Sequence, residues 1–84
     1  MSKFFVQFTD YAEGGMRGLA EGRKQEIKSA AKSALGSDPY GGGSAAVRGD
    51  RDRREITLVN AILSYDVSPA VVVVSVVRVS APFG

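Results

Sequence analysis

Apolar and polar residues alternate along part of this chain in the pattern of extended strands. In residues 3–9, Phe4, Val6 and Phe8 fall on one side of an extended chain and Phe5, Gln7 and Thr9 on the other, which is typical of a strand with one buried face. Residues 70–79 are an almost unbroken valine run, which is typical of a strand buried on both faces. Two shorter apolar segments, 54–59 and 62–67, predict two more strands joined by a tight connection at residues 60–61. The sequence therefore predicts four strands.

Between the first and second strands the apolar period lengthens to that of a helix. Thr9 or Asp10 offers a side-chain oxygen to cap a first helix, on which Ala12, Met16 and Leu19 share one face. The glycines of this segment disfavour a helix unless packing holds it, and they also permit a close approach to another element.

Gly22 interrupts the pattern, and a second, more regular helix is expected over residues 23–35. Its apolar stripe consists of Ile27, Ala30, Ala31, Ala34 and Leu35. Gly36 ends this helix, and the glycine-rich residues 36–44 predict a mobile loop. Two helices joined at a glycine indicate an antiparallel helical hairpin.

The order of elements is β-α-α-β-β-β, which places the chain in the α+β class. We expect one domain over residues 1–84, with the helical hairpin on one face of a small, mostly antiparallel sheet. Alternation would put four valines on one face of the last strand, namely Val71, Val73, Val77 and Val79, and three on the other, namely Val72, Val74 and Val76. Two helices cover only one face. Either a partner protein shields the other face, or the strand curls and the loop covers it.

Composition excludes several classes of protein. The chain has 84 residues, of which 44% are hydrophobic and 24% charged, as in ordinary globular domains. It contains no cysteine and no histidine, so a zinc site is excluded, and we expect no metal and no cofactor. No segment resembles a secretory signal or a transmembrane helix, so we expect a cytoplasmic protein that is not bound to a membrane.

The net charge of +2 hides an uneven distribution of basic residues. One segment carries Arg48, Arg51, Arg53 and Arg54, and the second helix carries a stripe of Lys24, Lys28 and Lys32. Such guanidinium and ammonium groups suit contacts with a phosphate backbone. The alternative is a solvated loop in which the arginines pair with Asp50, Asp52 and Glu55, together with an ordinary lysine-bearing helix surface.

Several short segments, in this order and spacing, resemble the RelE/ParE superfamily of bacterial toxins. They are Phe-Val-Gln-Phe-Thr at 5–9, Asp-Pro at 38–39, Val-Arg-Gly at 47–49, Arg-Glu-Ile at 54–56, Tyr-Asp-Val at 65–67 and the valine strand. The resemblance implies a toxin that is neutralised by a cognate antitoxin in a hetero-oligomeric complex. It also implies one of two activities, which are cleavage of messenger RNA on the ribosome or binding to DNA gyrase without RNA chemistry.

The resemblance assigns candidate residues to an RNA-cleaving site. These catalytic candidates are Arg48, Arg54, Arg78 and Tyr65. The RNA-binding candidates follow from their positive charge and are Arg51, Arg53, Lys24, Lys28 and Lys32. Metal-free RNA cleavage needs cations beside the phosphate and usually a proton acceptor and donor. Alternation favours a buried or half-buried position for Tyr65, and carboxylates such as Glu21, Glu26 and Glu55 are candidate bases, although each is typical of a solvated charge.

The chain also departs from the pattern of the ribonuclease members, which leaves its enzymatic status open. It has no histidine, and residues 79–84 carry no tyrosine. Residues 60–63 read Asn-Ala-Ile-Leu where those members usually place a catalytic arginine. A toxin that cleaves ribosome-bound messenger RNA remains the first hypothesis. The alternatives are a gyrase inhibitor and a degenerate member that only binds its antitoxin.

Overall fold

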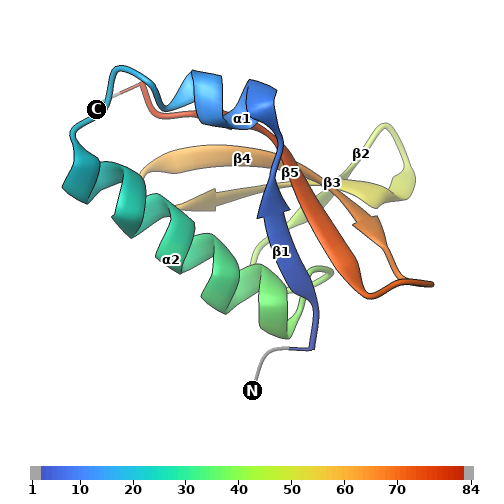
Figure 1. The fold of residues 1–84 in the computed structure, drawn as a ribbon. Coiled ribbons are helices and arrows are strands. Elements are labelled where there is room, and N and C mark those ends of the chain that lie inside the picture. Colours follow the sequence, from blue (N-terminus) through green and yellow to red (C-terminus); the bar gives the residue numbers. More distant parts are fainter. Residues whose placement is uncertain (1–2, 83–84) are drawn as a thin grey trace.

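Five strands form one mixed sheet in the computed structural model, which describes residues 3–82 (Figure 1). The strands are β1 (Phe5–Phe8), β2 (Ala45–Val47), β3 (Asp50–Leu58), β4 (Ala61–Ser68) and β5 (Val73–Ser80). Their order across the sheet is β1-β5-β4-β3-β2, and only the β1–β5 pair is parallel. The ends of the predicted 1–84 domain lie outside the described residues.

Two helices, α1 (Asp10–Gly15) and α2 (Glu21–Ser37), lie on the same face of this sheet (Figure 1). We call this the helix face and the opposite one the open face. The predicted α+β class, with helices on one face of a mostly antiparallel sheet, is confirmed. Neither helix in the described part of the chain is long and apolar enough to cross a membrane.

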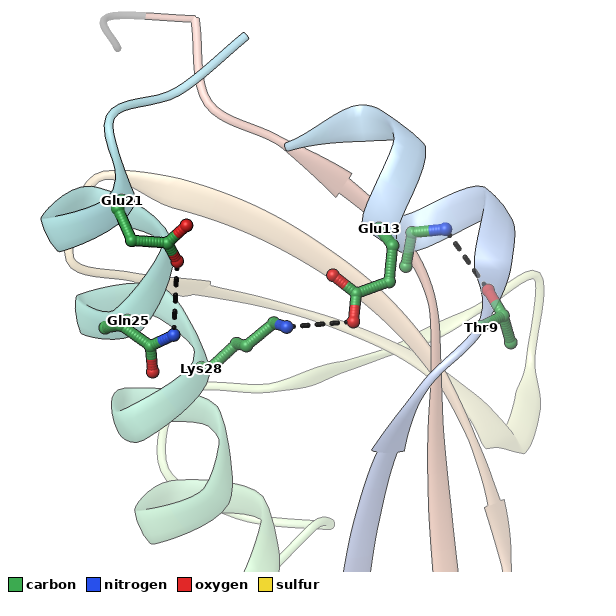
Figure 2. A network of polar contacts seen from close by, with 6 residues as sticks. Thr9, Glu13, Glu21, Gln25 and Lys28 are labelled. Atoms are coloured by element: carbon green, nitrogen blue, oxygen red, sulfur yellow. Dashed lines mark hydrogen bonds and ion pairs between the residues drawn. The ribbon is translucent and has the colours of Figure 1, made fainter. Parts of the chain in front are cut away.

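Helix α1 is shorter than the sequence predicts. Thr9 caps it by accepting a hydrogen bond from the Ala12 amide at 3.2 Å, as expected, but the helix ends at Gly15 and does not reach Leu19 (Figure 2). A Cβ at Gly15 would lie 2.6 Å from the backbone oxygen of Val79. The glycine therefore allows the close packing of α1 on β5, at the expense of helix propensity.

Helix α2 begins at Glu21, so the prediction that Gly22 separates the two helices is wrong. Glycine costs less in a first turn that packing holds, and Ile27 and Leu35 are fully buried against the sheet. Lys28 Nζ donates to a Glu13 carboxylate oxygen at 2.8 Å and thereby ties α2 to α1 (Figure 2).

The valine segment is a strand only from Val73 onward, because the preceding residues form the turn after Pro69. A bulge further along changes the predicted faces. Tyr65 of β4 pairs with Val76 of β5, and the preceding Ser64 pairs with Arg78. Val77 therefore has no partner on β4 and is the extra residue of a bulge. As a result three valines that simple alternation would separate are buried on the helix face, namely Val74, Val76 and Val79.

Two hairpin turns also differ from the sequence expectations. The β3–β4 turn is formed by Val59 and Asn60, one residue earlier than predicted, with φ of 44° and 64°. Strand β2, which was not predicted, joins β3 through Arg48 and Gly49, whose φ values are 54° and 77°. Positive φ at both central residues is the geometry that matches the twist of a tight hairpin. Of the four clustered arginines, Arg51, Arg53 and Arg54 therefore lie on a strand, and Arg48 lies in the tight turn that precedes it.

Candidate functional site

Strand alternation divides the arginine cluster between the two faces of the sheet. In the β3–β4 register Arg54 lies opposite Tyr65 on the helix face, whereas Arg53 lies opposite Asp66 on the open face. Paired residues on adjacent strands project to the same side. The cluster that looks continuous in the sequence is thus two separate groups in space.

On the helix face Arg54 holds the loop that follows α2. Its guanidinium donates to Ser44 Oγ at 3.1 Å, to the Tyr40 carbonyl at 3.2 Å and to the Arg51 carbonyl at 3.2 Å. These acceptors occupy a large part of the guanidinium donor set. Arg54 is therefore an anchor for the loop, which the sequence had predicted to be mobile.

Tyr40 completes this anchor. Its hydroxyl donates to Asp52 Oδ1 at 2.7 Å, and the Arg51 guanidinium lies 4.5 Å from its ring centroid. The hydrogen bond to Asp52 raises the pKa of Tyr40, with burial adding to the effect and Arg51 opposing it. Both Arg51 and Asp52 are thus engaged with an aromatic side chain of their own chain.

Tyr65, a catalytic candidate from the sequence, is fully buried in the core. Its hydroxyl donates to the Pro39 carbonyl at 2.6 Å. In this structure Tyr65 has no surface to offer a substrate, and its hydroxyl is bonded to the loop that contains Pro39. We call the group Tyr40, Arg51, Asp52, Arg54 and Tyr65 the loop anchor.

The other basic candidates are dispersed. Arg53 forms an exposed ion pair with Asp66 at 3.0 Å, and this hydrogen bond raises the pKa of Arg53. Arg48 is exposed in the β2–β3 turn. Since β3 and β4 lie between β2 and β5, the strand that leads into this turn is roughly 14 Å from the last strand. The structure does not bring Arg48 and Arg78 together.

The lysine stripe lies on α2, in the helical layer and away from the open face. Lys28 binds Glu13 and sits 5.8 Å from the Phe8 ring centroid, so it supports packing between the helices and β1. Lys24 is half-buried and Lys32 is exposed. These lysines could meet an RNA only along the helical side of the molecule.

Arg78 is exposed on the open face and lies in one row with two polar residues. The sheet register places Glu55 opposite Ser64 and Ser64 opposite Arg78. Two strand spacings put the backbones of Glu55 and Arg78 roughly 10 Å apart. The row Glu55–Ser64–Arg78, with Ile62 and Ser80 beside it, lines a hollow of about 230 Å³.

This open-face row combines the groups that metal-free phosphodiester chemistry uses. Glu55 carries a carboxylate that can accept a proton, and Arg78 carries a guanidinium that can stabilise charge on phosphoryl oxygens. The two side chains form no ion pair with each other in this structure. Residues 3–82 hold no group of three or more carboxylates arranged to bind a metal ion.

Sequence reasoning named Arg78 but gave Glu55 little weight and missed Ser64. The signal that finds all three is the period-2 pattern itself. Ile56 and Leu63 point into the core, so the residues before Ile56 and after Leu63 must point outward. Only the pairing register, which the sequence does not state, shows that they share a row.

Comparison with known proteins identifies the fold. No family model and no curated protein matches the sequence. Among solved structures, the isolated E. coli RelE toxin has a TM-score of 0.70 at 26% identity and matches over 93% of this chain and 83% of its own. The chain belongs to the RelE superfamily.

Two further structures show the same RelE fold at lower identity. The toxin-antitoxin complex RelBE2 from Mycobacterium tuberculosis gives a TM-score of 0.84 at 18% identity, over 100% of this chain and 97% of the matched one. The archaeal RelE-RelB complex from Pyrococcus horikoshii OT3 gives a TM-score of 0.71 at 13% identity, over 96% of this chain and 97% of the matched one. The open-face row and the loop anchor therefore stand on a RelE scaffold.

Proposed function

We propose that this chain is the toxin of a toxin-antitoxin pair and that it cleaves messenger RNA on the ribosome. The superfamily supports the toxin part, since the similar structures are described as RelE toxins or their complexes with antitoxins. One observation carries the RNA part, namely the exposed row in which Glu55 and Arg78 flank Ser64. That row presents a base and a cation on either side of a small side chain.

The proposed reaction is an internal transfer on RNA. Glu55 takes the proton of a 2′-hydroxyl, whose oxygen then attacks the adjacent phosphorus. A bond from phosphorus to the 2′-oxygen forms, and the bond to the 5′-oxygen breaks. Arg78 stabilises the charge that builds on the phosphoryl oxygens, and the departing 5′-oxygen takes its proton from water.

The antitoxin is proposed as the partner that covers the open face. No element in residues 3–82 covers this face, and Phe5 on β1 remains 66% exposed there. A protein seated on the sheet would bury Phe5 and would also block Arg78. Binding and neutralisation would then be one event.

Primer extension on a translated message tests the proposal. Purified chain added to a translating extract is expected to produce breaks within codons at the ribosomal A site. Glu55→Gln should remove the breaks, whereas Glu21→Gln, which changes an exposed carboxylate on α2, should leave them. An intact message with toxin in excess over ribosomes would refute the RNA activity.

A gyrase inhibitor is the second candidate. It is favoured by the engagement of Arg53 with Asp66 and of Arg54 with the loop, which reduces the number of cations open to RNA. Supercoiling by purified gyrase distinguishes the candidates. Inhibition together with an intact message would establish the gyrase activity in place of RNA cleavage.

A further inference from the structure

A second hollow lies on the other side of Arg78, between the last strand and the first helix. Asp10, Tyr11 and Gly14 of α1 line one wall, and Arg78 and Ser80 of β5 line the other. Its volume is about 460 Å³, within the ~300–1,000 Å³ range of small-molecule sites. The proposed reaction uses Arg78 of this hollow and gives no role to its other residues.

The chain builds this hollow by ending one strand early. β1 stops at Phe8, which pairs with Val76, so the end of β5 has no strand partner along that edge. Helix α1 fills only part of the gap. A Cβ at Gly14 would meet nothing within 4 Å, so this position leaves open space, while Gly15 brings the helix backbone close to β5.

Tyr11 presents an aromatic ring at this hollow. It is 73% exposed, more than Phe5 at 66% or Val71 at 67%. Burial of an aromatic ring is favourable, so this exposed position forgoes stabilising energy. Exposed aromatic rings beside a cation serve as stacking platforms for nucleic-acid bases. Every base has a π-face, so such stacking tolerates different sequences.

The two hollows share Arg78 and Ser80, which connects this site to the row that contains Glu55. A phosphate bound by Arg78 would have Glu55 on one side and Tyr11 on the other. Asp10 repels a phosphate at the α1 end, so the charged end of a nucleotide must face Arg78 and its base must face α1.

We propose that the hollow between α1 and β5 binds the nucleotide next to the scissile phosphate, with its base stacked on Tyr11 and its phosphate on Arg78. This inference rests on the proposed function, because it takes RNA as the substrate. It adds a binding residue, Tyr11, that takes no part in the chemistry. The ligand is a single-stranded RNA segment and not a duplex, whose bases are already stacked.

Binding of a short, fluorescently labelled RNA tests the site. The RNA carries 2′-O-methyl groups throughout, so that it binds without being cleaved, and a matched set carries one abasic position each. Tyr11→Ala is expected to weaken binding about 5- to 150-fold, the loss typical of one stacked base. Tyr11→Phe keeps the ring and should bind as the unaltered chain does. Phe5→Ala removes another strongly exposed ring, which does not line this hollow, and serves as the control.

The abasic set makes the result specific to stacking. One abasic position should weaken binding to the unaltered chain by the same factor and should not weaken binding to Tyr11→Ala further. Three results would each overturn the site. They are binding by Tyr11→Ala that equals that of the unaltered chain, a loss in Tyr11→Ala that no abasic position reproduces, and no RNA binding by the unaltered chain. Base-dependent binding through Tyr11 with an intact translated message would keep the site and refute the proposed cleavage. Cleavage of the message, together with unchanged RNA binding by Tyr11→Ala, would support the proposed cleavage and refute the site.

Discussion

The loop anchor and the open-face row use the same kinds of side chain for different purposes. In the anchor, Arg54 is enclosed by Ser44, Tyr40 and backbone carbonyls, and Tyr65 is buried beneath it. In the row, Arg78 is exposed and has a carboxylate two strands away. The first arrangement consumes the hydrogen-bonding capacity of its arginine, and the second leaves it available.

The difference shows that density of charge along a sequence does not locate a site on a strand. Arg53 and Arg54 are neighbours in the chain, yet they lie on opposite faces and each has a protein partner. Arg78 has no arginine neighbour in the sequence, yet it faces both open hollows. The candidate site therefore follows from register and not from clustering.

The largest effect is expected from Arg78→Ala. Loss of a cation that stabilises transition-state charge typically lowers the rate about 100- to 1,000-fold. The side chain is exposed, so the urea midpoint should not change. The measurement is the initial rate of message cleavage, with Arg48→Ala as a matched control from the far edge of the sheet. An equal loss of cleavage rate in both variants would mean that the open-face row is not the site of cleavage.

Arg54→Ala is expected to act on stability. It removes four hydrogen bonds that the guanidinium donates, three of them to Tyr40 and Ser44 in the loop and one to the Arg51 carbonyl in β3. Hydrogen bonds to charged groups contribute about 1.5–3 kcal/mol. Since Arg54 is half-buried, we expect about 2 kcal/mol less unfolding free energy in urea. Arg54→Lys, which keeps the charge but cannot span the same acceptors, should recover only a minor part. A stable variant that had lost activity would instead place Arg54 in the site.

Tyr65→Phe is expected to have a smaller effect from the same region. It leaves the Pro39 carbonyl without its donor in a fully buried position and should cost about 1–1.5 kcal/mol. The matched control is Tyr11→Phe, which removes the same atom from an exposed ring and should leave the urea midpoint unchanged. Activity of the folded Tyr65→Phe variant should persist. A large loss of cleavage rate at full stability would restore Tyr65 as a catalytic residue.

Much of the fold could be predicted from the sequence because its periodicity is local. The alternation at 3–9 and the stripe of Ile27, Ala31 and Leu35 are properties of one segment each, and the structure buries them as expected. The errors occur where two segments meet. The β5 bulge opposite Tyr65 changes the faces of the valine strand, and only the pairing of β4 with β5 reveals it.

The candidate site was less predictable for the same reason. Its members come from β3, β4 and β5, and a row exists only once the register is known. Strand β2 was not predicted because it has only three residues, Ala-Ala-Val, and they are mostly exposed. The segment that follows it, rich in Arg and Asp, has the composition of a solvated loop, although cross-strand pairs such as Arg53 with Asp66 stabilise it as a strand.

The smallest expected effect concerns pH and belongs to the loop anchor alone. The hydrogen bond to Asp52 raises the pKa of Tyr40 above its unfolded value of 10.0, so the folded chain holds this proton more tightly than the unfolded one. The resulting stabilisation is complete below pH 10 and is lost as the pH rises through the folded pKa. Urea midpoints of the unaltered chain and Tyr40→Phe should therefore differ near neutral pH and converge above pH 10. Equal urea midpoints of the two chains at every pH would mean that Tyr40 holds the loop only by packing of its ring against Arg51, and that its hydroxyl contributes nothing.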